Sequence, residues 1–324
     1  MKGKKVGRSL GILGSLGILV MVLCCGCQSH SSYEKQEDRY VVGVVIKSNT
    51  SEYWMSVCSG MEIAADKYDM DVITLSPDSE VDRKVQEKQI EKLISQNVDA
   101  LAIAPVDSYT RPDYLQKIED QKITAVNFDN GMGDESLPYI GIDNYQAGYE
   151  LGKQLAESLG HEGQVGIVSG DLSQKGHLER VEGFKAYMES ESNMEVQFVE
   201  GGYANMQMSE KKVRDLMDQY PDIRGIMATS GVTAMGLVDE LKDTGIKIAA
   251  FDEQEDTLKA VEEGQIVALA AQSGYQIGYE TIHYLEKLRK GENPEKNYYV
   301  EAKILTQENI KEYTKKDESQ EYKK

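Results

Sequence analysis

Cysteine is scarce in this chain, and most of it lies in one place. Of the four cysteines among 324 residues, three fall within positions 24–27 and the fourth is Cys58. Residues 28–324 therefore contain a single cysteine, which excludes a disulfide within that part of the chain. Its stability must come from a buried core, and Cys58, on a predicted helix, is expected to be a small half-buried apolar residue rather than a reactive thiol.

Positive charge is also in short supply. The chain has 36 Lys and Arg against 55 Asp and Glu, so its formal net charge is -19. Nucleic-acid binding requires clustered Lys and Arg that contact phosphates, and this composition argues against such a partner. An acidic surface of this kind is typical of an ordinary globular protein.

Motifs for catalysis and for metals are missing. The four histidines stand alone, with no metal spacing among them, and His177 is interpreted as a surface or cleft-rim residue rather than a general base. There is no Gly-x-Ser-x-Gly elbow, no phosphate loop and no Gly-x-Gly-x-x-Gly after the first predicted strand. We therefore expect no enzyme activity, no cofactor and no metal.

The N-terminus has the three parts of an export signal. Basic residues precede residues 10–23, an apolar run of 14 residues without a charge that is shorter than the about 20 needed to span a bilayer. The run ends Leu23-Cys24-Cys25-Gly26-Cys27, which resembles a bacterial lipobox with Cys27 as the lipidated residue, although Cys24 replaces the usual aliphatic residue. We expect a signal peptide at 1–27, an extracytoplasmic chain anchored in the membrane through Cys27, and a polar tether at 28–39. An unprocessed membrane anchor is the alternative.

Beyond the tether, short apolar runs alternate with helical patterns. Strand-like runs at 41–46, 71–75, 99–104 and 123–128 are separated by helical patterns, and from 141 the alternation restarts with runs at 164–168, 195–199, 224–228, 247–251 and 266–271. Such alternation predicts parallel sheets covered on both faces. The expected fold is α/β, with two doubly wound parallel-sheet domains.

A helix at about 274–290 and a strand-like stretch at 298–305 follow the second half, where its sheet is already complete. The chain is therefore expected to cross back, which gives a multi-strand hinge. We expect an N-terminal domain of 40–143 plus 273–302, a C-terminal domain of 144–272 plus 303–314, and a disordered tail at 315–324.

The most informative loop follows the first predicted strand. In open α/β sheets, ligands bind beyond the carboxyl ends of the strands, and here that place holds Lys47, several hydroxyl and amide groups, Tyr53 and the single tryptophan, Trp54. Aspartates, amides and hydroxyls follow the other strands as well. This inventory suits a neutral polyhydroxylated ligand, because carboxylates accept strong hydrogen bonds from hydroxyls and aromatic faces cover sugar C–H faces. Helix N-capping is the alternative role for Asp129 and Asp252.

From Tyr40 to about Ile310 the chain resembles the type I periplasmic sugar-binding proteins, near the ribose- and allose-binding group of ABC transporter components. The marks are the opening VVIKSNTSEYWMSVCSGMEIAAD, Asn127-Phe128-Asp129, Ile142-Asp143-Asn144 with Gly148, Glu179-Arg180-x-x-Gly183-Phe184, Tyr220-Pro221-Asp222-Ile223, Ala250-Phe251-Asp252, and Ala271-Gln272 with Gln276-Ile277-Gly278. The resemblance implies three hinge crossings and a ligand site at Lys47, Ser51, Tyr53, Trp54, Asp129, Asn130, Arg180, Tyr203, Ser230, Asp252 and Gln272.

The chain departs from the family pattern within this same contact set. Asn130 stands where ribose-binding members have Arg, Ser230-Gly231 replaces the usual Asn-Asp, and Ala204, with Tyr203 beside it, occupies the place of the second-domain aromatic. Lys47 fits a hexose somewhat better than ribose, but the identity of the sugar, or of another small polar ligand, stays open.

The resemblance implies a monomeric receptor that binds a monosaccharide and delivers it to an ABC permease. The alternative is a sensor that reports sugar to a membrane histidine kinase or chemoreceptor. Transcription regulators share the fold but require a helix-turn-helix head, and the signal peptide and tether occupy that place here.

Overall fold

The computed structural model describes residues 39–191, 193–202 and 205–321. The predicted signal peptide with Cys27, the predicted tether up to residue 38, and Tyr203 lie outside the described residues. Over the described ranges, no helix combines the length and the apolar character that a membrane crossing requires.

Six parallel strands form the first sheet, in the order β11-β5-β4-β3-β1-β2. Its members are β1 (Tyr40–Val45), β2 (Met70–Leu75), β3 (Ala100–Ile103), β4 (Thr124–Phe128), β5 (Tyr139–Gly141) and β11 (Asn297–Tyr299). Strand β1 is rich in valine because both of its faces are buried. Val42 and Val44 pack into the core on one side of the sheet, while Val41 and Val45 pack into the core on the other.

The second sheet repeats this plan, in the order β12-β10-β9-β8-β6-β7. Its members are β6 (Glu162–Ser169), β7 (Asn193–Gly201), β8 (Ile223–Ala228), β9 (Lys247–Phe251), β10 (Ile266–Gln272) and β12 (Ala302–Leu305). All pairings are parallel except that of β12, which runs antiparallel to β10 at the edge.

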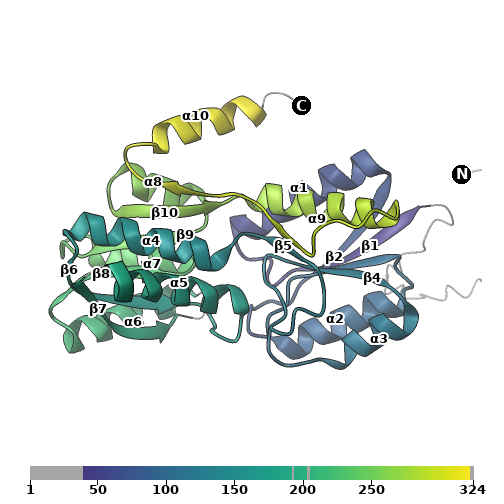
Figure 1. Ribbon diagram of the computed structural model, residues 1–324, viewed down its shortest axis with the longest axis horizontal. Coiled ribbons are helices and arrows are strands. Elements are labelled where there is room, and N and C mark those ends of the chain that lie inside the picture. The colour runs from purple at the N-terminus through teal and green to yellow at the C-terminus, as the bar shows by residue number, and fades with distance from the viewer. Residues whose placement is uncertain (1–38, 192, 203–204, 322–324) are drawn as a thin grey trace, which may run out of the picture. The chain divides into compact units, whose positions relative to one another are not determined.

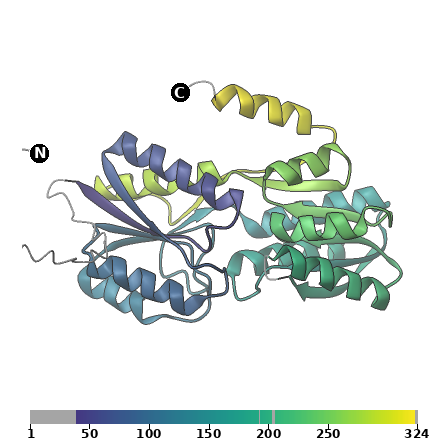
Figure 2. The same ribbon diagram turned by 180° about the vertical axis from the view of Figure 1, so that it is seen from behind.

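Helices cover both faces of each sheet (Figures 1 and 2). On the first sheet, α1 (Glu52–Tyr68) and α9 (Gly274–Arg289) lie on one face, and α2 (Arg83–Ser95) and α3 (Asp113–Gln121) on the other. On the second, α4 (Asn144–Leu159) and α5 (Lys175–Glu191) lie opposite α6 (Met206–Gln219), α7 (Gly231–Leu241) and α8 (Glu255–Glu262). The predicted fold class, two doubly wound α/β halves, is confirmed.

Each sheet carries a pair of neighbouring helices whose backbones come very close, and glycines make this approach possible. In the α1–α9 pair, a Cβ on Gly60 or on Gly278 would overlap a backbone carbonyl of the facing helix. In the α4–α5 pair, the same holds for Gly148 and Gly183. Because α1 and α5 begin beside strand ends, this packing also fixes the side chains that their first turns present there.

Within the described residues, the chain passes between the two sheets three times. The passages lie after β5, between β10 and α9, and between β11 and β12. Ser273 forms the second passage, and its hydroxyl accepts a hydrogen bond from the Gln276 amide at the start of α9. Residues from both halves meet around these passages.

Three local expectations differ from the structure. Strand β5 was not predicted, because its three residues after Pro138 are too few to show a pattern. The stretch at 298–305 is divided between β11 and β12, which belong to different sheets. The predicted disordered tail is helical as far as the described residues extend, within α10 (Ile310–Glu321), because Lys, Glu and Gln favour a helix even without apolar residues to bury.

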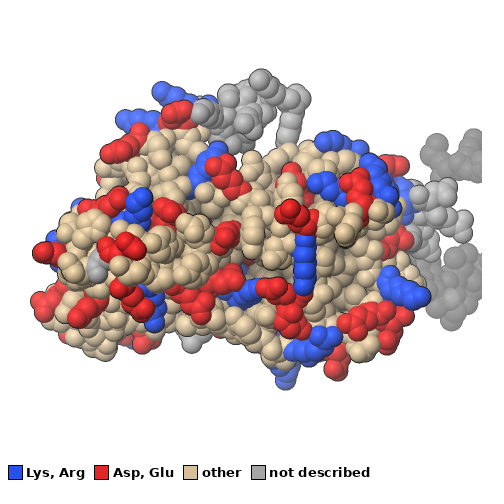
Figure 3. Space-filling model, viewed as in Figure 1, with Lys and Arg blue, Asp and Glu red and all other residues tan. Residues whose placement is uncertain are grey.

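Acidic and basic side chains are interspersed over the face drawn in Figure 3. The excess of negative charge is therefore distributed on this face rather than gathered in one patch, as expected for a generally acidic surface.

Candidate functional site

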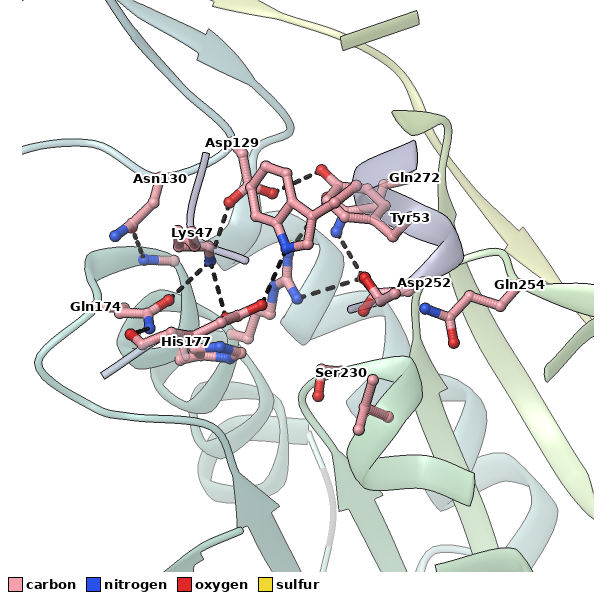
Figure 4. A pocket seen from close by; sticks show the side chains of 16 residues that line it. Lys47, Tyr53, Asp129, Asn130, Gln174, His177, Ser230, Asp252, Gln254 and Gln272 are labelled. Carbon is pink, nitrogen blue, oxygen red and sulfur yellow. Dashed lines mark hydrogen bonds and ion pairs between the residues drawn. The ribbon is translucent and has the colours of Figure 1, made fainter. Parts of the chain in front are cut away.

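One cavity collects the strand-end side chains of both sheets (Figure 4). Its empty volume is about 480 Å³, part of which opens to solvent. Ten of the eleven predicted ligand residues line it, and Tyr203 lies outside the described residues. The lining residues are Lys47, Ser51, Tyr53, Trp54, Glu80, Asp129, Asn130, Gln174, Gly176, His177, Arg180, Ser230, Val232, Asp252, Gln254 and Gln272.

Lys47, directly beyond β1, is held on the first-sheet side by oxygen atoms of three side chains. Its Nζ lies 3.0 Å from Asp129 Oδ2 and 3.7 Å from Glu80 Oε2, and it donates to Gln174 Oε1 at 2.7 Å. Burial lowers the pKa of the Lys47 ammonium, but Asp129 and Glu80 more than offset this, so the pKa lies above its ordinary value. Lys47 is therefore a fixed cation at the cavity wall.

Asp129 joins this cation to the aromatic pair. The Tyr53 hydroxyl donates to Asp129 Oδ1 at 2.6 Å, and burial together with the Asp129 charge holds the Tyr53 pKa well above its usual value. Asp129 thus binds Lys47 and Tyr53 rather than capping a helix, which was the alternative role. Asp129 also lines the cavity, and an ionised carboxylate has about four acceptor positions, so it can accept further hydrogen bonds.

Trp54 is almost completely buried, and the polar edge of its indole is fixed. Its Nε1 donates to Glu80 Oε1 at 3.0 Å, and Lys47 Nζ lies 5.5 Å from its ring centroid. The Tyr53 and Trp54 planes stand at 74°, so the two rings meet edge to face. The pair therefore forms a corner of the cavity rather than two parallel walls.

Arg180 is the cation on the second-sheet side. Its guanidinium donates to Asn144 Oδ1 at 2.8 Å from Nε, to the Thr229 carbonyl at 2.7 Å from Nη1, and to Gln272 Oε1 at 3.3 Å from Nη2. Its Nη1 also lies 3.7 Å from Asp252 Oδ1. The guanidinium carbon lies 4.2 Å from the centroid of the Phe251 ring, and this face contact adds a cation–π attraction.

Asp252 is the second-half counterpart of Asp129. Its Oδ1 accepts from Gln272 Nε2 at 2.5 Å, and its Oδ2 accepts from the Gly231 amide at 2.8 Å. Gly231 is the first residue of α7, so Asp252 partly fulfils the alternative capping role, although toward α7 and not toward α8, which directly follows it.

Three of the predicted residues line the cavity in different ways. Asn130 uses its amide within the protein, because Nδ2 donates to the Pro105 carbonyl and Ser108 Oγ, and Oδ1 accepts from the Gly176 amide. Ser230 caps α7. Ser51 precedes α1 without a side-chain cap bond. Asn130 therefore connects the two halves directly.

Sequence reasoning missed Glu80, Gln174, Gly176, Val232 and Gln254. Gln174, 1% exposed, reaches across from the second half and donates to the Glu80 carbonyl as well as accepting from Lys47. Its loop stood out as a strand end, but nothing in the sequence singles out the glutamine. Glu80 lies in the loop between β2 and α2, which begins at Arg83, and nothing in the sequence singles it out.

The sequence predicts His177 at the surface or at the rim of the cleft, and this prediction is wrong. The side chain is only 5% exposed and is buried in the wall of the cavity. Its Nδ1 lies 2.9 Å from Thr229 Oγ1. Burial, with added repulsion from Lys47 and Arg180, holds the His177 pKa well below its usual value. The imidazole is neutral at ordinary pH and contributes a packing and hydrogen-bonding group.

Comparisons with known proteins agree with this geometry. The family model described as periplasmic binding protein domain matches residues 42–293. The D-ribose/D-allose-binding protein of Pseudomonas aeruginosa is 24% identical over 302 residues, covering 87% of this chain and 94% of that protein.

Two solved structures have the same fold. A periplasmic solute-binding protein of an ABC transporter from Actinobacillus succinogenes, with bound D-allose, has a TM-score of 0.79 at 22% identity over 85% of this chain and 100% of that one. The sugar-binding protein of a sugar ABC transporter from Bacillus halodurans has a TM-score of 0.74 at 29% identity, over 84% and 99% of the two chains. The chain therefore belongs to the type I periplasmic binding proteins, a family of extracytoplasmic binding proteins rather than enzymes.

Proposed function

We propose that this protein binds a monosaccharide in the cavity between its two halves. The observation that carries the proposal is the pairing of Asp129 and Asp252, carboxylates from opposite sheets, each beside a fixed cation and facing one cavity. Carboxylates accept hydrogen bonds from sugar hydroxyls, and Lys47 and Arg180 can donate to ring and hydroxyl oxygens. The proposal is supported by related proteins named for ribose and allose and by a relative solved with D-allose.

The ligand set is Lys47, Ser51, Tyr53, Trp54, Asp129, Asn130, Arg180, Tyr203, Ser230, Asp252 and Gln272. In this proposal the domains 40–143 plus 273–302 and 144–272 plus 303–314 close on the sugar about the three passages of the chain. Cys27 carries lipid that anchors the monomeric receptor to the extracytoplasmic face of the cell membrane. An ABC permease in that membrane takes up the released sugar.

The binding step can be tested with the chain's own fluorophore. Trp54 is the single tryptophan, is 2% exposed and lies against Lys47 and Glu80. A sugar entering the cavity should change its emission, and calorimetry should give a dissociation constant near the micromolar range, about -8 kcal/mol. The panel should include pentoses, hexoses and polyols, with the Trp54→Phe variant as the control for the optical signal. Lack of binding across the whole panel would exclude the sugar assignment.

Anchoring and delivery need separate tests. Labelled fatty acid should enter the wild-type chain and not the Cys27→Ala variant, which should leave the membrane fraction. Delivery predicts that the sugar-loaded receptor stimulates ATP hydrolysis by a reconstituted permease encoded beside it. A neighbouring histidine kinase or chemoreceptor gene without permease genes would favour the sensing alternative.

A further inference from the structure

On the side away from the cavity, Arg180 contacts Asn144, which in turn contacts Tyr139, and neither of these two residues lines the cavity. Asn144, the first residue of α4, accepts from Arg180 Nε at 2.8 Å and donates from its Nδ2 to Tyr139 Oη at 3.2 Å. Tyr139 is the first residue of β5. The two residues flank the first passage between the sheets, so one hydrogen-bonded chain connects that passage to a cation of the site.

The arrangement fixes which end of the Asn144 amide faces Arg180. The Nδ2 group has two acceptors nearby, Tyr139 Oη and the Ile142 carbonyl at 3.5 Å, while Oδ1 faces the guanidinium. A reversed amide would place N–H groups against the N–H of Arg180. Asn144 itself is 2% exposed.

The Tyr139 hydroxyl is itself held in place. It lies 3.2 Å from the Asp129 carbonyl and 3.1 Å from the Ile142 carbonyl, so its proton has acceptors while its oxygen remains free to accept from Asn144. A Cβ at Gly141 would overlap this hydroxyl and its ring, so glycine is needed there for Tyr139 to occupy this position. Burial holds the Tyr139 pKa well above its usual value, which keeps the hydroxyl protonated.

We propose that Asn144 and Tyr139 are positioning residues of the ligand site, which hold the Arg180 guanidinium in its binding orientation from outside the cavity. The inference rests on the proposed sugar-binding function. Without the Asn144 acceptor, Nε–H would be buried and unpaired, and the guanidinium would turn from the Thr229 carbonyl and Gln272 toward another acceptor. Tyr139 acts one step further away, through the orientation of the Asn144 amide.

A double-mutant cycle tests whether Asn144 acts through Arg180. With the sugar that binds best, Asn144→Ala should weaken affinity at least tenfold and Tyr139→Phe two- to fivefold. In an Arg180→Lys background, Asn144→Ala should change affinity less than twofold, because the lysine has no Nε–H for Asn144 to hold. An equal loss in both backgrounds would overturn the proposal.

Asn127→Ala is the matched control, since Asn127 is also a buried asparagine, donates to the Ile103 carbonyl and has no contact with Arg180. Its effect on affinity should be the same in both backgrounds.

A crystal structure of Asn144→Ala keeps this proposal separate from the sugar assignment. In this variant the hydrogen bond from Arg180 to the Thr229 carbonyl should be broken, and this can be observed without knowing which sugar binds. An unchanged Arg180 would refute the positioning role even if the wild-type protein binds sugar. Displacement of Arg180 together with lack of wild-type sugar binding would refute the proposed function instead.

Discussion

Asp129 and Asp252 occupy equivalent places in the two halves: each directly follows the third strand from one edge of its sheet, and each has a left-handed backbone. Their φ angles are 59° and 72°. Residues other than glycine rarely adopt this conformation, which costs about 1–2 kcal/mol, although the short polar side chain of aspartate tolerates it better than most. In both halves this turn leads out of a buried strand and places a carboxylate at the cavity.

The aspartate pair yields the first prediction. Asp129→Asn and Asp252→Asn keep the size and the backbone tolerance but remove the charge, so each should weaken sugar binding by about tenfold, the difference between charged and neutral hydrogen bonds. Calorimetry measures this directly. Asp134→Asn, which changes an exposed carboxylate outside the cavity, is the control and should leave affinity unchanged. Affinities within twofold of wild type for both cavity variants would contradict a contact role.

The balance of charge in the cavity predicts selectivity against anions. Among the described residues that line the cavity, Glu80, Asp129 and Asp252 carry negative charge and Lys47 and Arg180 carry positive charge. Each of these cations already lies within 4 Å of a carboxylate oxygen. A uronic acid should therefore bind about 100-fold more weakly than the matching neutral aldose, since one like-charge contact costs a few kcal/mol at such a site. Competition titrations followed through Trp54 emission would measure the ratio.

Glu80→Gln provides the internal check on this prediction. The substitution removes one negative charge while the glutamine can still accept from the Trp54 indole, so the penalty for the uronic acid should shrink. An unchanged ratio would show that shape rather than charge excludes the acid.

The architecture was predictable because buried parallel strands leave a direct trace in the sequence. A run such as 41–46 must be apolar throughout when both faces of the strand are covered, and β1 is such a strand. Strand β5 leaves no comparable trace, because three residues cannot show a pattern and their pairing depends on β4 and β11. The same limit applied to 298–305, where only tertiary structure decides that β11 and β12 join different sheets.

The cavity lining was predictable where a residue closely follows a strand, as Lys47, Asp129 and Asp252 do. Gln174 could not be found in this way, since it belongs to the second half and reaches Lys47 and the Glu80 carbonyl of the first half. Glu80 lies several residues beyond β2, and its contacts with Trp54 and Lys47 have no local sequence signal. His177 was misjudged because its burial depends on Thr229 and on Gly170, where a Cβ would overlap the imidazole ring. Neither contact has a local sequence signal.

His177 predicts how stability depends on pH. Its pKa is held low in the folded protein and is near 6.5 when the chain is unfolded, so the unfolded state binds a proton that the folded state excludes. The stability present above about pH 6.5 is therefore lost as pH falls toward the folded value, by up to about 1.4 kcal/mol per pH unit. Urea unfolding at pH 7.5 and 5.5 should show a loss in wild type that is about 1 kcal/mol larger than in His177→Gln, because the two proteins differ in this one titratable group. An equal loss in the two proteins would mean that His177 is protonated in the fold.

The helix contacts give the last prediction, which links packing to the site. Gly278→Ala and Gly148→Ala place a methyl group against a backbone carbonyl of the facing helix, at Val57 and Arg180 respectively, and a backbone atom cannot move aside as a flexible side chain can. Each should lower the free energy of unfolding by about 1–3 kcal/mol in urea titrations. Gly176→Ala is the matched control, because the nearest atoms to its Cβ lie at 3.4 and 3.5 Å, and alanine in a helix normally adds stability.

The two destabilised variants should also differ in function. Gly148→Ala pushes on the residue that carries the guanidinium and should weaken sugar binding, whereas Gly278→Ala disturbs α1 one turn beyond Tyr53 and Trp54 and should mainly alter Trp54 emission. Stabilities equal to that of Gly176→Ala would mean that the helices can separate without loss, and that their close packing does not hold the site in place.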